Sequence, residues 1–221
     1  PVVGPVSRTN SVFVEDAKFL RQQTSQPIKW ALPGPMTMID TLQSRIAPTL
    51  DRGGDLLLPT LARLIFAATL AGYFWVSGLT KLGDGLLGIV QPSVGAYAQI
   101  FPRAMEMAGY DASPLTVFHW AVVVAGTWAE FILPALIILG LFTRLAALGM
   151  IGFVVVQSLT DLIGHGAIND PAVFGAWFDR HADALILDQR AFWVLLLAVL
   201  IFKGAGPLSL DRLIFGAKPT G

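Results

Sequence analysis

The chain has 221 residues, of which 54% are hydrophobic and 14% are charged, and its formal net charge at pH 7 is zero. A typical soluble domain is about one-quarter charged, so this composition indicates a lipid environment. The balanced charge gives no support for a nucleic-acid-binding surface. Cysteine is absent, which excludes disulfides, thiolate metal sites and cysteine redox chemistry.

Residues 1–55 are polar and mixed in character, unlike the rest of the chain. Within residues 1–42, the stretches "VVGPV", "EDAKFLRQQT" and "KWALPGPMTM" resemble the cobalamin-independent methionine synthase family. The resemblance implies a strand–helix–strand portion of a barrel, but a closed (β/α)₈ barrel takes about 250 residues. We therefore expect residues 1–42 to be a largely non-functional fragment and residues 43–221 to form a separate domain.

Long apolar runs begin at Leu56 and are separated by polar loops. A helix needs about 20 mostly apolar residues to cross a bilayer. Four runs are candidates, and the fourth reaches that length if it is extended back to about Ala184 or on to Ala205; they are residues 56–78, 115–142, 145–163 and 191–202. The sequence predicts an all-α integral membrane protein, a four-helix transmembrane bundle preceded by the short N-terminal fragment.

Two ionisable residues stand out in the second and third runs. Arg144 lies in "LFTRLA" between them, which predicts a short turn with the arginine side chain reaching the membrane interface. Glu130 differs, because about 1.5 Å of rise per residue places it about 18 Å from Phe142, near mid-membrane. A carboxylate at that depth needs a partner or a function.

The distribution of lysine and arginine near the span ends predicts the orientation. With four spans both termini share one side, and that side carries more of these cations than the other. The terminal side has Arg45, Arg52, Arg144, Lys203, Arg212 and Lys218, and the other side has Lys81, Arg103, Arg180 and Arg190. We therefore expect both termini in the cytoplasm.

Three further stretches resemble the DoxX family of small bacterial four-helix membrane proteins. They are "LARLIFAATLAGYFWVSGLTKL" (61–82), "AEFILPALIILGLFTRLAALGMIGF" (129–153) and "GAGPLSLDRLI" (204–214), in the same order and spacing, and the resemblance covers roughly residues 50–215. It implies a multi-pass protein of the bacterial inner membrane. It also implies a link to quinone chemistry, because relatives include the DoxD subunit of a thiosulfate:quinone oxidoreductase.

Depth along the predicted helices places Arg63 close to Glu130. Arg63 lies about 10 Å in from the terminal side and Glu130 about 18 Å from the same side, so we expect an Arg63–Glu130 pair. One interpretation is a structural ion pair that fixes helix register. The other is a catalytic role, in which the carboxyl handles protons or contacts a quinone.

A second polar group is expected near the opposite face of the membrane: Lys81, His119, Asp161 and His165. A quinone head-group needs hydrogen-bond donors beside an apolar channel, so these residues are candidate cofactor-binding residues for a membrane quinone. The simpler alternative is that they are interfacial residues capping their helices. In the following loop, His165, Asp179, His181 and Asp183 match no strong metal motif, so neither a metal nor haem is predicted.

Three functions remain open from the sequence. The leading hypothesis is a membrane subunit associated with quinone-linked oxidoreductase activity, with partner subunits and the lipid bilayer as its partners. The second is a non-enzymatic assembly or scaffold subunit, whose polar residues would pair internally and leave no cavity. The third is a small-solute or proton transporter, in which Arg63, Glu130 and His119 would line a polar path.

Overall fold

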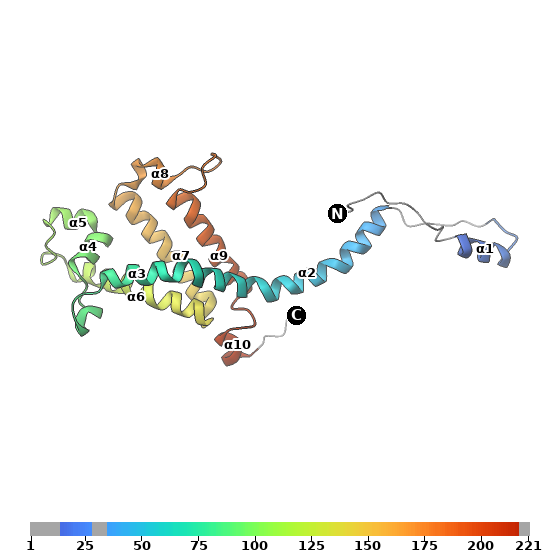
Figure 1. Ribbon diagram of the computed structural model, residues 1–221, viewed down its shortest axis with the longest axis horizontal. Coiled ribbons are helices and arrows are strands. Elements are labelled where there is room, and N and C mark those ends of the chain that lie inside the picture. Colours follow the sequence, from blue (N-terminus) through green and yellow to red (C-terminus); the bar gives the residue numbers. More distant parts are fainter. Residues whose placement is uncertain (1–13, 28–34, 217–221) are drawn as a thin grey trace. The chain divides into compact units, whose positions relative to one another are not determined.

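The computed structural model describes residues 14–27 and 35–216 (Figure 1). In these ranges every regular element is helical, which confirms the all-α expectation. The chain divides into two compact units, residues 1–49 and residues 50–221. The expected boundary after residue 42 falls inside helix α2, which runs from Pro35 to Phe66.

The N-terminal unit contains helix α1 (Val14–Gln23) and the beginning of α2. The stretch "EDAKFLRQQT" nearly coincides with α1. The segments for which the methionine synthase resemblance implies strands fall mainly in residues 1–13 and 28–34, which lie outside the described residues. The structure therefore adds no support for that resemblance.

The second unit contains long helices joined by short ones. The long helices are α2, α3 (Gly72–Lys81), α6 (Val117–Leu139), α7 (Thr143–Leu159) and α9 (Arg190–Lys203). Three π-helical segments extend them: η1 (Ala67–Ala71), η3 (Thr160–Gly164) and η5 (Leu185–Gln189). The connecting elements are η2 (Leu86–Ile89), α4 (Val94–Ile100), α5 (Pro102–Met107), η4 (Ala167–Asn169), α8 (Pro171–Phe174) and α10 (Leu210–Phe215).

Four continuous helical stretches are long and apolar enough to cross a membrane, as predicted. Within the described ranges they are Ile39–Lys81, Val117–Leu139, Thr143–Gly164 and Leu185–Lys203. The first begins earlier than the apolar run at Leu56, because its helix continues back through polar residues. The fourth starts at Leu185, so the extension back to about Ala184 is the one that the chain adopts.

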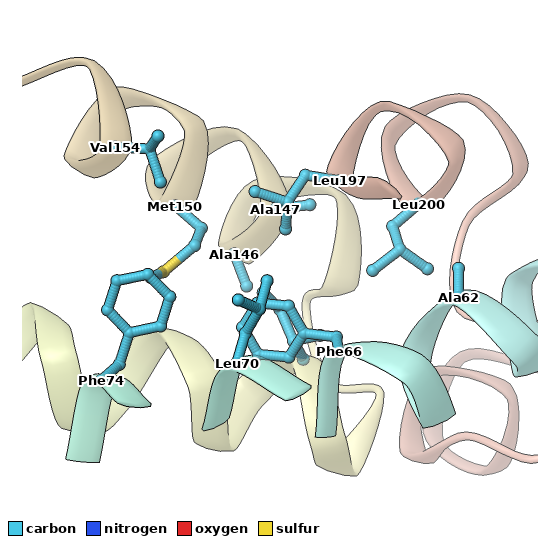
Figure 2. Packing of buried hydrophobic residues seen from close by; sticks show 11 residues of the cluster. Ala62, Phe66, Leu70, Phe74, Ala146, Ala147, Met150, Val154, Leu197 and Leu200 are labelled. Carbon is cyan, nitrogen blue, oxygen red and sulfur yellow. The ribbon is translucent and has the colours of Figure 1, made fainter. Parts of the chain in front are cut away.

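The core of the bundle lies where the first span meets α7 and α9. Figure 2 shows Phe66, Leu70 and Phe74 of the first span facing side chains of the other two helices. Those side chains include Met150 of α7 and Leu197 of α9, and both are fully buried. Burying each such side chain stabilises the fold by about 1.5–3 kcal/mol in water. Between helices in lipid, this stabilisation comes from close van der Waals packing and not from removal of apolar surface from water.

The opposite faces of the same helices carry large exposed apolar side chains. Leu64 is 62% exposed, Leu148 58% and Leu195 62%. Soluble monomers rarely expose contiguous apolar surface on this scale. These faces therefore fit acyl chains, in agreement with the four spans.

The turn between α6 and α7 is held by residues far away in the chain. Gly140 ends α6 with φ +68° and occupies the left-handed region. Arg63 donates hydrogen bonds to the carbonyls of Ile137 and Ile138 at the end of α6, and to those of Ala205 and Leu208. The Asp211 carboxylate accepts hydrogen bonds from the Phe142 and Thr143 amides at 2.7 and 3.0 Å. We call this arrangement the C-terminal latch; it consists of Arg63, residues 137–143 and residues 205–211.

Candidate functional site

A partly open cavity of about 520 Å³ lies between α3, α6 and the second half of the third span. Most of its lining is apolar, and polar groups project from α3, α4, α6 and the third span with the residue that follows it. The polar lining residues are Tyr73, Ser77, Lys81, Gln99, Glu130, Gln157, Thr160, Asp161 and His165. Four of the six residues predicted as site residues are among them: Lys81, Glu130, Asp161 and His165.

One wall of the cavity holds a buried ion pair between Lys81 and Glu130. The Lys81 Nζ atom lies 3.0 and 2.9 Å from the two Glu130 carboxylate oxygens, and the two side chains are 7% and 2% exposed. Ser77 completes the group, because its hydroxyl donates to Glu130 at 2.9 Å and accepts from Lys81 at 2.7 Å. Ser77 and Lys81 are four residues apart and therefore share one face of α3.

The close approach of α3 and α6 makes this pair possible. A Cβ atom on Gly78 would lie 2.8 Å from the Phe131 ring, so a larger residue at this contact would require the ring to shift. The Trp75 indole also donates to the Phe131 carbonyl at 3.3 Å. These contacts bring the neighbouring turns of the two helices together and set Lys81 opposite Glu130.

The predicted pair between Arg63 and Glu130 is wrong. Arg63 is committed to the four carbonyls of the C-terminal latch, and Glu130 is paired with Lys81. The depths of Arg63 and Glu130 along their helices did not reveal that residues 205–208 offer carbonyls to the arginine. Arg63 therefore has a structural role, as in the interpretation of a contact that fixes helix register. Its partners are backbone carbonyls and not a carboxylate.

The opposite wall is built on the third span and held by Arg190. The Arg190 guanidinium contacts Asp161 at 2.6 Å and Ser158 at 3.0 Å, and its side chain is 3% exposed. It also lies over the Trp193 ring, 5.9 Å from the centroid. Asp161 belongs to the π-helical segment η3, and Arg190 directly follows η5. Such segments occur often at functional sites because they redirect a side chain within a helix.

Two further hydrogen bonds complete the polar lining. The Gln157 side-chain amide donates to the Tyr73 hydroxyl at 2.8 Å, which joins the third span to α3 across the cavity. The His165 Nε2 atom lies 3.0 Å from the Gln99 carbonyl. Since a carbonyl only accepts, His165 carries its proton on Nε2 in this contact.

His119 does not lie with the other candidate residues. Its Nδ1 atom lies 3.2 Å from the Thr116 amide and 2.8 Å from the Thr116 hydroxyl, and its ring packs on Phe101 with a centroid separation of 4.7 Å. It therefore caps the first turn of α6. This is the helix-capping alternative, and it removes His119 from the predicted cofactor-binding group.

The loop that follows the third span gives no support for a metal site. Within residues 14–27 and 35–216, no three His, Asp or Glu side chains are placed to share an ion. The Asp179 carboxylate instead accepts from the His181 amide at 2.9 Å.

Sequence reasoning missed Arg190, Tyr73 and Gln99 as parts of the site. For Arg190 a signal existed: it opens the fourth span, and Asp161 ends the third, so two adjacent antiparallel helices bring them to one depth. Tyr73 and Gln99 carried no comparable signal, because their roles depend on the rotation of their helices.

Comparisons with known proteins identify the family. The sequence profile of the DoxX family matches residues 58–160, which contain the residues of both cavity walls except Asp161, His165 and Arg190. An uncharacterized protein of Haemophilus influenzae is 35% identical over 164 residues, which cover 71% of this chain and 85% of that protein. No solved structure matches the chain. The chain therefore belongs to the DoxX family and is a multi-pass membrane protein.

Proposed function

We propose that this protein is a membrane subunit of a quinone-linked oxidoreductase, and that its cavity binds the quinone head-group. The observation that carries the proposal is the cavity of about 520 Å³ between helices long enough to span a membrane. Ligand sites typically measure about 300–1,000 Å³, with mostly apolar walls and a few placed polar groups. This cavity has that size and that composition.

The residues present fit a quinone head-group. Such a ring is flat and apolar on its faces, with carbonyl oxygens at opposite ends that accept hydrogen bonds. Phe153, Val156 and Leu133 supply apolar surface in the cavity. The Gln157 amide donates to the Tyr73 hydroxyl at 2.8 Å, which leaves a second amide N–H and the tyrosine O–H as donors at one place on the cavity wall. The chemistry supplied by a bound quinone is the uptake or release of two electrons and two protons.

The chain's own residues would position the ring and hold protons beside it. Lys81 holds a proton at Nζ, and Glu130 together with Ser77 fixes that ammonium group at the cavity wall. Arg190 orients Asp161 through one carboxylate oxygen, Oδ2. The electrons would come from partner subunits, in line with the hypothesis of a membrane subunit within a larger oxidoreductase.

The structure also bears on the proposed location in the bacterial inner membrane. Two of the four cations counted on the side opposite the termini, Lys81 and Arg190, are buried in ion pairs. Only Arg103 and Arg180 then remain on that side as loop cations. The excess of lysine and arginine on the terminal side is therefore larger than the raw count, which supports cytoplasmic termini.

The two alternative functions are less consistent with this geometry. A scaffold subunit was expected to leave no cavity between its polar residues. A transporter was expected to align Arg63, Glu130 and His119 along one path. These three residues have separate surroundings: the C-terminal latch, the Lys81 ion pair and the first turn of α6.

Quinone that co-purifies with the protein tests the proposal. We would quantify quinone by mass spectrometry in the unaltered protein, in Gln157→Leu and in His119→Ala, the matched control outside the cavity. Gln157→Leu keeps the side-chain volume but removes the donor, so we expect its quinone content to fall by about tenfold. His119→Ala should retain the quinone. Quinone no higher than in the detergent extract of the same membranes would reject the proposal.

A further inference from the structure

The cavity has an opening on one side of the bundle, between α6 and the third span. Ala125 of α6 and Gly152 and Val156 of α7 all line the cavity, and all three are exposed residues. They lie within helices long enough to span a membrane. The opening therefore faces the acyl chains of the bilayer and not the aqueous phase.

Two glycines on the same helix show where α6 and α7 separate. A Cβ on Gly149 would lie 3.2 Å from a Leu133 methyl carbon, so the two helices touch at that turn. A Cβ on Gly152, one turn further along, would meet nothing within 4 Å. Small residues in membrane helices usually serve close packing. Gly152 instead leaves space open at the cavity, which Ala125 of α6 also lines.

The charged pair of the cavity is buried, with Lys81 7% and Glu130 2% exposed, whereas the residues at the opening are exposed. Lys81 and Glu130 are at the contact between α3 and α6, and the Tyr73–Gln157 hydrogen bond joins α3 to the third span. A molecule entering past Gly152 would therefore meet exposed apolar residues before it reached the buried Lys81–Glu130 pair. That order suits an amphiphile that enters with its polar head leading.

We propose that the opening lined by Ala125, Gly152 and Val156 is a lateral portal, through which the ligand enters from the bilayer and in which its apolar chain remains. The inference rests on the proposed function and defines its ligand further: the quinone must carry a long hydrocarbon chain. The ring lies at the polar wall, and the chain leaves between α6 and α7. A ring without a chain binds more weakly but does not depend on the portal.

Binding of two rings to portal variants tests the inference. The ligands are a benzoquinone with a long alkyl chain and the same ring with a methyl group, each measured by equilibrium binding in one detergent. Gly152→Leu and Ala125→Leu narrow the portal from its two sides, and Val155→Leu adds bulk at an exposed position of α7 that does not line the cavity. We expect both portal variants to weaken long-chain binding by about tenfold or more. Methyl-ring binding should stay at the level of the unaltered protein.

The outcomes separate this inference from the proposed function. If a portal variant loses affinity for the long-chain quinone and for the methyl quinone equally, the new side chain reaches the ring site. If its affinity for the long-chain quinone is unchanged, the chain leaves the cavity elsewhere. Either result overturns the portal and leaves the quinone site standing. If neither ring binds the unaltered protein above the detergent blank, the proposed function fails and the portal fails with it. The second portal variant decides the matter if the first does not fold.

Discussion

At the scale of single residues, Lys81 and Glu130 are the most constrained ionisable groups of the cavity. Both are almost fully buried, and each is the other's charged partner. Removing two charges from a polar solvent costs several kcal/mol per ion, and mutual attraction with good geometry offsets that cost. Loss of one partner should therefore harm the protein more than loss of both.

Glu130→Gln should lower the free energy of unfolding by about 3 kcal/mol, because it leaves Lys81 buried beside a neutral amide. The double variant Glu130→Gln, Lys81→Met removes the uncompensated charge and should recover most of that loss. Thermal unfolding of the variants in one detergent, arranged as a double-mutant cycle with Lys81→Met alone, measures the coupling. Additive effects in the cycle would show that the pair contributes nothing as a pair.

At the scale of elements, the bundle depends on sharp turns and on irregular helical segments. Gly140 ends α6 in the left-handed region, and the backbone around it is enclosed by Arg63 and Ser209. The π-helical segment η3 turns Asp161 toward Arg190 and the cavity. These features place the functional groups, while the straight parts of the helices supply the packing.

Gly140→Ala should destabilise the protein by about 2 kcal/mol or more, since the residue has φ +68° and the new Cβ would lie 2.6 Å from the Ser209 Cβ. Gly152→Ala is the matched control, because its Cβ would meet nothing within 4 Å. Alanine also favours a helix by up to about 1 kcal/mol over glycine. Midpoints of thermal unfolding compare the two. An equal effect of both substitutions would contradict the enclosed geometry around Gly140.

At the scale of the whole molecule, orientation in the membrane decides from which side each loop is reached. Four spans place both ends of the bundle's chain on one side. In the proposed orientation, which follows from the cation count corrected for buried Lys81 and Arg190, that side is the cytoplasm. In that proposed orientation the cavity lies toward the outer half of the membrane, because Lys81 is the last residue of α3 and His165 directly follows η3.

Single cysteines can test this orientation cleanly, because the chain has no cysteine of its own. Leu86 is 93% exposed in the loop after the first span, and Leu213 is 80% exposed after the fourth. A membrane-impermeant maleimide should label Leu86→Cys in cells whose outer membrane alone is permeable. Leu213→Cys should react only after the inner membrane is opened. The reverse pattern would place the termini outside.

The sequence predicted the fold well and the site in part, for identifiable reasons. Apolar runs determine spans directly, so the four helices followed from composition and length. Depth along a helix is also readable, which is why Lys81, Asp161 and His165 were grouped correctly. The rotation of a helix about its axis and the position of free backbone carbonyls cannot be predicted from the sequence. Arg63 was therefore paired with Glu130 and not with the carbonyls that it contacts. His119 was misplaced because a histidine that caps a helix looks the same in sequence as one that binds a ligand.

The C-terminal latch has a consequence for how the protein is made. Residues 205–211 follow the fourth span, yet they hold the turn between the second and third spans together with Arg63 of the first. Chains emerge from the ribosome N-terminus first, at about 5–20 residues per second. The turn at Gly140 must therefore wait, with the Arg63 guanidinium lacking some of its final acceptors, until synthesis has passed the last span. Until then an early helix carries an incompletely satisfied charge, which is a point where membrane quality control could recognise an unfinished chain.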